Sequence, residues 1–476
     1  MKHLKPLFTL ALLLLICSAG FSQIRVACIG TGLIKVQDGV HIADSLSYPA
    51  QLQKKLGSSY AVLNYTVSGA TVVSKGGRSY RDEKVYQQAM ASKPNVVLME
   101  FGIEDSKPIN RIHLDEFLKD YRELIHSFKA VSPKARIILL LPPPSFKPDT
   151  ADVWDRVLTG KISPLIQKLA YEDQLEVISL RLPLIDQPTL FRDLIHPNAQ
   201  GITIIATRLN ELLSAQHTGA LSFFAGIAPS PHISSFYGYA CTDFKFQGRD
   251  CKVVQPKWSA VGHPWIWRAR FWNTEPQTDV ALLERGYHLV YCDVAELYGN
   301  SKAINIWNDF YDLMQQAGLC KKVVLEGMSR GGVYVYNWAA ENPEKVACVY
   351  ADNPVLNLKS WPGGKGKGPG SKKDWELVKV DYNLISTLDE DRFSESPLDK
   401  VGKIVKGRYP MLHVLADADE VVPPDENTIP FEQQVKSLGG TITVIHKPGF
   451  KHHPHSLTNP APIVNFIINV VSKPIQ

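Results

Sequence analysis

The sequence predicts an α/β protein with two domains, each built on a mostly parallel sheet covered by helices. The chain has 476 residues, more than one hydrophobic core usually serves. Short apolar runs alternate with longer amphipathic segments over residues 24–216 and again over residues 236–476. In the second stretch, an apolar run leads through Gly327-Met328-Ser329-Arg330-Gly331 into a helical pattern, which is typical of a nucleophile turn.

The first 22 residues predict a secretory signal peptide. Residues 1–6 are basic, and residues 7–17 form an apolar core that is too short to span a bilayer. Small residues follow, so we expect the mature chain to begin at Gln23. A lipoprotein anchor at Cys17 is the alternative, but the bulky Ile16 before it does not suit such a site. We therefore expect a periplasmic or secreted protein, and no later segment predicts a membrane span.

Charge and cysteine content narrow the class of partners. The formal net charge is +5, and Lys2 and Lys5 of the signal segment contribute two of these charges. This near balance argues against a nucleic-acid partner. The cysteines lie mostly in apolar runs typical of buried thiols, and no Cys-x-x-Cys metal spacing occurs. Cys241 and Cys251 flank an expected hairpin, where the sequence leaves a disulfide undecided. No cofactor is expected, and the oligomeric state does not follow from the sequence.

Residues 24–216 predict a first domain in which a parallel sheet lies between two layers of helices, a flavodoxin-like arrangement. Ligands of such sheets bind at the carboxyl ends of the strands. The expected strands span 24–29, 60–67, 95–101, 135–141 and 175–180, and the expected helices span 112–130, 162–171 and 201–215.

Two blocks at the expected strand ends resemble the SGNH (GDSL-type) hydrolases. Val67-Ser-Gly-Ala70 is similar to the glycine block of that family, and Phe191–Gly201 is similar to its Asp-x-x-His block. The resemblance implies that Gly69 stands at the oxyanion glycine. It also implies that Asp193 and His196 stand at the acid and the base of the catalytic site.

Two other blocks depart from that family. Gly30-Thr31-Gly32 replaces Gly-Asp-Ser, which puts Gly32 at the nucleophile position and displaces Thr31 by one residue. Gly102-Ile103-Glu104-Asp105 replaces Gly-x-Asn-Asp, so the carboxylate of Glu104 stands where the family has an oxyanion-hole amide. A fixed negative charge opposes formation of an oxyanion. We interpret the first domain as non-catalytic, with a role in binding glycan or in packing against its neighbour.

A linker is expected at residues 217–235, followed by a second domain over residues 236–476. A hairpin opens this domain, strands and helices then alternate, and the nucleophile turn stands in the middle, an order that resembles the α/β-hydrolases. The expected strands span 242–246, 251–254, 263–271, 287–294, 323–325, 347–350, 411–415 and 441–446. The expected helices span 279–285, 304–316, the segment from the nucleophile turn up to residue 342, 431–438 and 460–471.

The α/β-hydrolase resemblance assigns a serine nucleophile and an acid. Ser329 is the expected nucleophile, because a tight strand-to-helix turn leaves the central hydroxyl exposed. Ala416–Pro423 resembles the acid turn Gly-x-x-Asp-x-x-Val-Pro of these hydrolases, which favours Asp419 as the acid. Asp417 is the nearby competitor, and we interpret it as a turn former.

The segment His446–His455 resembles the histidine loop and offers three candidate bases. The base of the α/β-hydrolases follows Gly-x-x, which favours His452 after Gly449. His453 and His455 remain close alternatives. Neighbouring histidines are also typical of zinc sites, but a serine and an acid in the right order favour the general-base hypothesis, so no metal is expected.

One oxyanion donor is expected from the backbone N–H of Arg330, which follows the nucleophile. The second donor is not identified, because Arg268 and Arg270 stand on one face of an expected strand where these hydrolases often have His-Gly. Either arginine, or the side chain of Arg330, is a candidate to meet the oxyanion or an acidic substrate. Arginine directly after the nucleophile resembles the glucuronoyl esterases. The alternative is that these arginines pair with structural acids such as Asp293.

Residues 353–409 form an insertion at the place where α/β-hydrolases usually carry a lid. Trp361–Lys373 is rich in glycine and lysine and predicts a flexible, basic segment. A lid that gates the site and attracts an anionic polymer is one hypothesis. A solvated loop is the other hypothesis, and we favour it.

Together these patterns predict an exported serine esterase. It would hydrolyse acyl or uronate esters on plant or algal polysaccharide through an acyl-enzyme on Ser329. Export, and the resemblance of the first domain to a family rich in carbohydrate acetylesterases, motivate a carbohydrate ester as the substrate. The alternatives are a serine peptidase of the prolyl-oligopeptidase type and a glycan-binding protein in which both domains are inactive.

Overall fold

The computed structural model describes residues 23–33, 44–149, 152–219, 221 and 231–472. The expected signal peptide lies outside these residues. The chain divides into two compact units, one made of residues 1–138 and 196–214 and the other of residues 139–195 and 215–476. No helix in the described part of the chain is long and apolar enough to cross a membrane.

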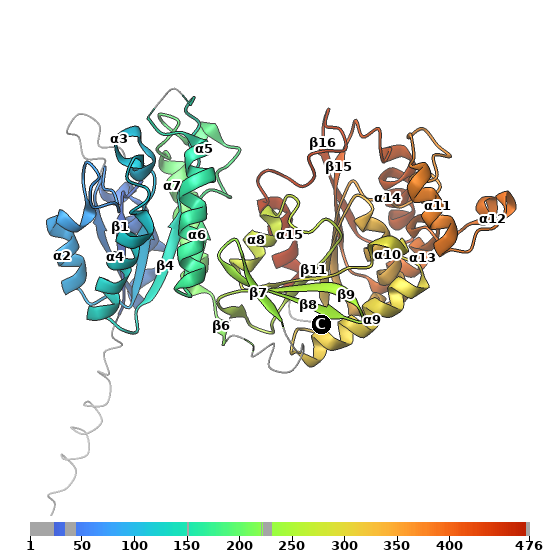
Figure 1. Ribbon diagram of the computed structural model, residues 1–476, viewed down its shortest axis with the longest axis horizontal. Coiled ribbons are helices and arrows are strands. Elements are labelled where there is room, and N and C mark those ends of the chain that lie inside the picture. The colour runs from blue at the N-terminus through green and yellow to red at the C-terminus, as the bar shows by residue number, and fades with distance from the viewer. Residues whose placement is uncertain (1–22, 34–43, 150–151, 220, 222–230, 473–476) are drawn as a thin grey trace, which may run out of the picture. The chain divides into compact units, whose positions relative to one another are not determined.

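A five-stranded sheet organises the N-terminal part of the chain (Figure 1). Its strand order is β2-β1-β3-β4-β5, and β1 pairs parallel with both β2 and β3. Every residue of β3 is buried, as expected for a strand that is covered on both faces. The strands are β1 (Ile24–Gly30), β2 (Tyr60–Thr66), β3 (Val96–Glu100), β4 (Arg136–Leu141) and β5 (Glu176–Ser179).

The helices of this part agree only partly with the sequence prediction. The helices α4, α6 and α7 overlap the expected ranges, whereas α1, α2 and the short helices α3 and α5 are absent from the prediction. In α2 only Tyr86 and Ala89 are buried, which is too sparse for a recognisable apolar repeat. The bounds are α1 (Tyr48–Leu56), α2 (Lys84–Ala91), α3 (Pro108–Arg111), α4 (Phe117–Val131), α5 (Asp155–Val157), α6 (Ser163–Glu172) and α7 (Ala199–Ser214).

A nine-stranded sheet forms the core of the C-terminal part. Its order is β16-β15-β14-β13-β11-β12-β9-β8-β7, with the strand before Ser329 near the middle. At one edge of the sheet, β7, β8, β9 and β12 pair antiparallel with one another in that order. From β12 across β11, β13, β14 and β15 to β16, every neighbouring pair is parallel. This is the α/β-hydrolase order, so the expected fold class is confirmed.

The strands of this sheet lie close to their expected ranges, and β7 begins inside the segment expected to be a linker. They are β7 (His232–Phe236), β8 (Tyr239–Phe246), β9 (Arg249–Gln255), β11 (Trp265–Ala269), β12 (His288–Cys292), β13 (Val323–Met328), β14 (Val346–Asp352), β15 (Met411–Ala416) and β16 (Ile442–Lys447), and a separate small sheet pairs β6 (His217–Thr218) with β10 (Ser259–Ala260).

The helix α10 (Gly331–Glu341) follows the nucleophile turn and is buried at every position before Glu341. Its Trp338 meets Trp267 of β11 with 5.3 Å between ring centroids, and Trp267 stacks on Trp307 of α9 at 4.2 Å. These aromatic contacts hold the helix firmly against the sheet. The other helices are α8 (Gln277–Leu283), α9 (Ser301–Gln316), α14 (Thr428–Ser437) and α15 (Ala461–Val471).

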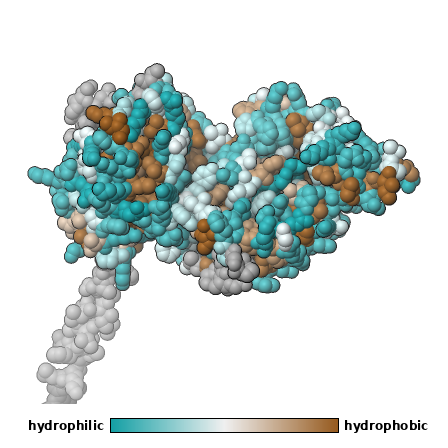
Figure 2. Space-filling view, viewed as in Figure 1, coloured by the Kyte–Doolittle hydropathy of each residue, from teal (hydrophilic) through white to brown (hydrophobic). Residues whose placement is uncertain are grey.

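The insertion differs from the solvated loop that we favoured. Its Trp375, Val378 and Phe393 are buried in a small core that also contains Val333 of α10. Apolar side chains also reach the surface near α12, where Ile385 is 84% exposed (Figure 2). The insertion contains the helices α11 (Lys372–Asp381), α12 (Thr387–Arg392) and α13 (Val401–Ile404).

Two lysines of the expected basic segment are ion-paired. Lys365 lies 3.0 Å from Glu390 and 3.4 Å from Asp391, and Lys367 pairs with Asp425. These acids offset the charge of both lysines. The hypothesis that this segment attracts an anionic polymer is weakened accordingly.

The described cysteines are not joined in disulfides. Cys241 and Cys251 flank the hairpin of β8 and β9 as expected, but they do not face each other, because Cys241 stands opposite Val254. Cys251 faces Cys292 of β12 instead, and both thiols are buried. The hairpin geometry therefore gives no support to a bond between Cys241 and Cys251.

Candidate active site

Ser329 stands in a tight turn between β13 and α10. Its φ of 49° is in the left-handed region, and its backbone N–H donates to the Asp352 carbonyl of the neighbouring strand at 2.9 Å. Glycine is required on both sides of the turn. A Cβ on Gly327 would lie 2.8 Å from the Gly331 carbonyl oxygen, and a Cβ on Gly331 would lie 2.8 Å from the Ala269 carbonyl oxygen. The local sequence thus determines this turn.

The side chains of Ser329, His452 and Asp419 form a hydrogen-bonded chain. Ser329 Oγ lies 3.0 Å from His452 Nε2, and His452 Nδ1 lies 2.7 Å from Asp419 Oδ2. These partners imply the tautomer with the proton on Nδ1, so that Nε2 accepts from the serine hydroxyl. The other oxygen of Asp419 accepts the backbone N–H groups of Val421 and Val422 at 2.8 and 2.9 Å. The carboxylate is therefore held in place from behind.

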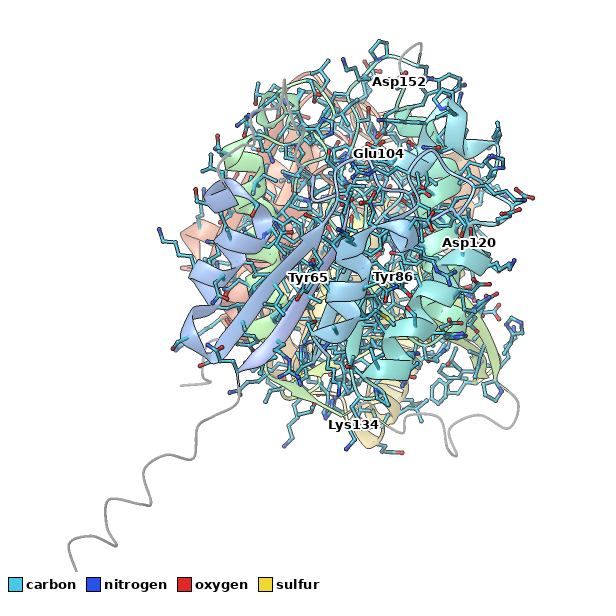
Figure 3. All side chains as sticks on the ribbon, turned by 90° about the vertical axis from the view of Figure 1, so that its left-hand side faces the viewer. Tyr65, Tyr86, Glu104, Asp120, Lys134 and Asp152 are labelled. Carbon is cyan, nitrogen blue, oxygen red and sulfur yellow. The ribbon has the colours of Figure 1, made fainter. Side chains whose placement is uncertain are left out.

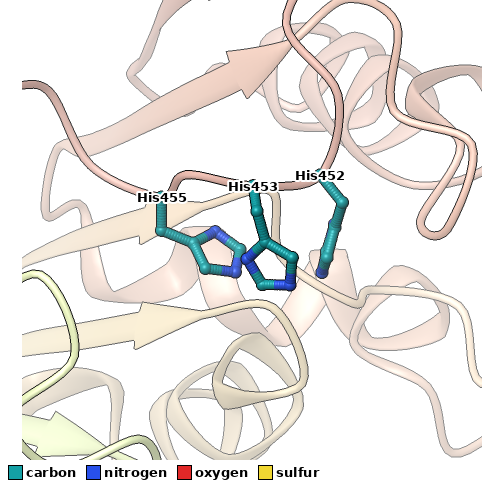
Figure 4. Close-up of side chains that lie close together, drawn as sticks. All are labelled: His452, His453 and His455. Carbon is teal, nitrogen blue, oxygen red and sulfur yellow. The ribbon is translucent and has the colours of Figure 1, made fainter.

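The competing residues named from the sequence have other partners. Asp417 lies 2.7 Å from His446 Nδ1, with both side chains partly exposed. His453 is exposed, and His455 Nδ1 lies 2.6 Å from Asp352 (Figure 4). Of the candidate acids and bases, Asp419 and His452 are the pair that the structure brings to Ser329.

Asp352 and Asn353, which the sequence analysis did not single out, support the histidine loop. Asp352 ends β14, accepts from His455 and also accepts the Ser456 N–H at 2.8 Å. Asn353 donates to the His452 carbonyl at 3.1 Å and accepts the Ala416 N–H at 2.7 Å. The available signal was their position directly after the strand next to Ser329, because neighbouring parallel strands end at the same edge of a sheet.

Arg330 is the N-cap residue of α10. The first backbone N–H groups of a helix have no partner within the helix. Its side chain points into the insertion. Nη1 donates to Asp374 at 3.0 Å and to the Tyr298 hydroxyl at 3.3 Å, and the guanidinium lies 5.7 Å from the Phe271 ring. Arg330 thus links the nucleophile turn to the insertion.

Arg268 is buried and uses all five of its N–H donors inside the protein, so it has none left for an oxyanion or a substrate. Its carboxylate partners are Asp279 at 2.5 Å and Glu326 at 3.1 Å, and not Asp293, the acid suggested from the sequence. Burial raises the pKa of Glu326, while the guanidinium of Arg268 lowers it. The remaining partners of Arg268 are the Phe271 and Thr274 carbonyls and the Met328 sulfur.

Arg270 follows β11 with a φ of 70°, and its guanidinium lies 5.4 Å from the Phe271 ring. Its Nε is buried and has no hydrogen-bond partner among the described residues. Arg270 therefore remains a candidate for substrate contact, in contrast to Arg268.

Three residues of the degenerate first site follow strands, whereas its acid and base positions precede a helix. Gly32 follows β1 with a φ of 77°, and a Cβ built on it would lie 2.5 Å from Thr66 Oγ1. Gly69 follows β2 with a φ of 84°. Glu104 (Figure 3) follows β3 and pairs with Lys107 at 2.7 Å. Asp193 and His196 lie in the segment that precedes α7.

Two buried carboxyl groups lie close to these strand ends. Glu100 accepts hydrogen bonds from the N–H and the hydroxyl of Thr31, and burial raises the pKa of Glu100 to about 8 against these bonds. Asp105 accepts the N–H groups of Val72 and Val73, and burial raises the pKa of Asp105 to about 7. Asp105 holds the loops through backbone N–H groups bonded to both of its oxygens, whereas Glu100 Oε1 has no hydrogen-bond partner among the described residues.

Residues 37–204 match the model of the GDSL-like lipase/acylhydrolase family, and the matched range begins after Gly32. A curated relative, an acetylxylan esterase of Xylanibacter ruminicola, is 35% identical over 210 residues. The match covers 40% of this chain and 42% of the relative, so the chain spans less than half the length of that protein.

Two of the solved structures that match part of this chain are Est1E and Est24. Est1E from Butyrivibrio proteoclasticus matches with a TM-score of 0.37 and 16% identity, over 49% of this chain and 99% of that chain. Est24, a carbohydrate acetylesterase from Sinorhizobium meliloti, matches with a TM-score of 0.34 and 16% identity, over 40% of this chain and 99% of that chain. The fold assignment rests on the strand order and the family match: the chain combines a GDSL-like segment with an α/β-hydrolase sheet.

Proposed function

We propose that this chain is an exported serine esterase that hydrolyses acyl or uronate esters on plant or algal polysaccharide. The observation that carries the proposal is the hydrogen-bonded chain from Ser329 through His452 to Asp419. The three residues come from the ends of separate strands of one sheet, which is how this fold assembles a triad.

The geometry supports a two-step ester hydrolysis. Ser329 Oγ attacks the ester carbonyl while His452 Nε2 takes the hydroxyl proton, and Asp419 stabilises the imidazolium. The backbone N–H of Arg330 donates to the oxyanion that forms. When the tetrahedral intermediate collapses, His452 returns the proton to the leaving alcohol. Water then attacks the acyl-enzyme by the same proton route and releases the acid.

The proposed substrate class rests on the similarity of this chain to known proteins. The curated relative is an acetylxylan esterase, and the first part of this chain matches a lipase/acylhydrolase family. We propose a non-catalytic SGNH-like domain at residues 24–216 and a catalytic domain at residues 236–476, because the first domain has glycine where the family has its serine. Export rests on the pattern of residues 1–22.

Covalent trapping tests the nucleophile directly. The full chain is treated with a fluorophosphonate ester, and the labelled peptide is identified by mass spectrometry. We expect one adduct, on Ser329. A substrate panel then distinguishes the alternatives: release of acetate or of methanol from esterified polysaccharide supports the esterase, cleavage of aminoacyl anilides supports a peptidase, and glycan binding without turnover or adduct supports a binding protein.

Replacing Asp419 by asparagine should lower kcat by about 10⁴-fold, because the amide favours the wrong imidazole tautomer while keeping the shape. The matched control is Asp417→Asn, two residues away and bonded to His446 instead, for which we expect kcat within about twofold of the parent. Steady-state kinetics on an aryl acetate measure both. Equal losses in the two variants, or a loss only in Asp417→Asn, would contradict the assignment of the acid.

Replacing Arg330 by lysine should reduce turnover of uronate esters while sparing neutral acetates. A lysine keeps the charge but loses the planar pair of donors that suits a carboxylate-like group. We expect at least about a tenfold lower kcat/KM on a methyl uronate ester and little change on an aryl acetate. Equal losses on both substrates would mean that Arg330 acts on the turn, through Asp374, and not on the substrate.

A further inference from the structure

Three imidazole rings gather beside the nucleophile on the loop after β16. Figure 4 shows His452, His453 and His455 pointing to the same side of this loop. Each ring centroid lies 4.8 Å from the other two, and one nitrogen of each residue lies within 4.8 Å of the others. This spacing makes the three residues a candidate metal-binding group.

Buried carboxylates hold two of these rings in a fixed orientation. Asp419 accepts from His452 Nδ1 at 2.7 Å, and Asp352 accepts from His455 Nδ1 at 2.6 Å. With its proton on Nδ1, each ring keeps a lone pair on Nε2. A carboxylate behind the imidazole is the arrangement that orients a metal-binding histidine and makes it a stronger ligand.

The charges around the rings suit a divalent cation. Besides Asp352 and Asp419, Glu275 faces the loop and accepts the His455 backbone N–H at 2.9 Å. Lys447 opposes them, with its ammonium 4.0 Å from Asp352. Three carboxylates against one ammonium leave a local excess of negative charge to balance a cation.

We propose that His452, His453 and His455 bind a divalent transition metal such as Zn²⁺, and that this metal reversibly inhibits the chain. A set of imidazoles without a carboxylate ligand suits zinc, copper and nickel, whereas Mg²⁺ and Ca²⁺ prefer oxygen. Because His453 is exposed, the ion reaches the site from solvent. The ion takes the Nε2 lone pair of His452, which otherwise accepts from Ser329 at 3.0 Å.

Calorimetric titration of the full chain with Zn²⁺ tests the binding, which does not depend on the proposed function. We expect one site, with affinity in Ser329→Ala at least equal to that of the parent, because the hydroxyl no longer competes for Nε2. His453→Ala should weaken binding by at least about tenfold. The matched control is His446→Ala, an exposed histidine of β16 outside the cluster, with unchanged affinity. Mg²⁺ should not bind.

Inhibition is then measured on an aryl ester, and this arm rests on the proposed function. Zn²⁺ should stop turnover, EDTA should restore it, and His453→Ala should need at least about tenfold more Zn²⁺. Equal Zn²⁺ affinity of the parent and His453→Ala, or no binding to the parent, overturns the proposal. Binding to an active enzyme without loss of turnover overturns the inhibitory step. A parent without esterase activity refutes the proposed function, while the calorimetry still decides the metal site.

Discussion

Replacing Ser329 by alanine is expected to lower ester turnover of the full chain by about 10⁶-fold, since the nucleophile and its base act as one unit. His452→Ala should cost a similar factor, and the double variant should lose no more than either single variant. Ser329→Ala and His452→Ala should each have the unfolding temperature of the parent, within a few degrees. Ester turnover that survives Ser329→Ala unchanged would refute the proposed nucleophile.

The same variant isolates the degenerate first site. Gly32 provides no hydroxyl, and Thr66 occupies the space that a side chain there would need. We therefore expect the residual turnover of Ser329→Ala to be insensitive to a further His196→Ala change. A residual rate that disappears with His196→Ala would show that the first site is catalytic.

Replacing Arg268 by methionine is expected to destabilise the C-terminal part by about 3–5 kcal/mol. The change removes the cation that faces Asp279 and Glu326, and both carboxylates are fully buried. Carboxylates left in an apolar interior must either take up protons or stay charged without a partner, and both are costly. Urea unfolding followed by tryptophan fluorescence measures the loss, because Trp267, the residue directly before Arg268, lies in the core of this part.

The matched control for Arg268 is Arg249→Ala, which removes an ion pair with the half-exposed Glu296. Such pairs contribute about 0–1 kcal/mol, so the urea midpoint should hardly move. Similar effects of the two substitutions would contradict the structural role of Arg268. A kinetic loss in Arg268→Met without a loss of stability would instead restore Arg268 as a residue that acts on the substrate.

The parts of the site that carry local sequence signals were predictable. The turn around Ser329 needs glycine on both sides, and the Val-Pro after the acid turn fixed the register on Asp419 rather than Asp417. The spacing from Gly449 likewise selected His452. In each case, the signal comes from residues that are close in the sequence. The sequence therefore predicted the three side chains that the structure brings together.

Contacts between distant segments were not predictable. Arg268 meets Glu326 because β11 lies beside β13, with these two residues in register, and no motif marks that pairing. The bond between His455 and Asp352 joins residues 103 positions apart. The insertion was misjudged because glycine and lysine dominate Trp361–Lys373, whereas its helices begin at serine caps such as Ser371 and Ser386.

The two carboxylates behind the histidine loop attach it to the sheet at two points. Asp352 and Asp419 lie at the ends of adjacent strands, β14 and β15, and each holds a histidine of the same loop. The two bonds hold different histidines. With Asp352 still bonded to His455, loss of the Asp419 carboxylate would misalign His452 without releasing the loop from the sheet.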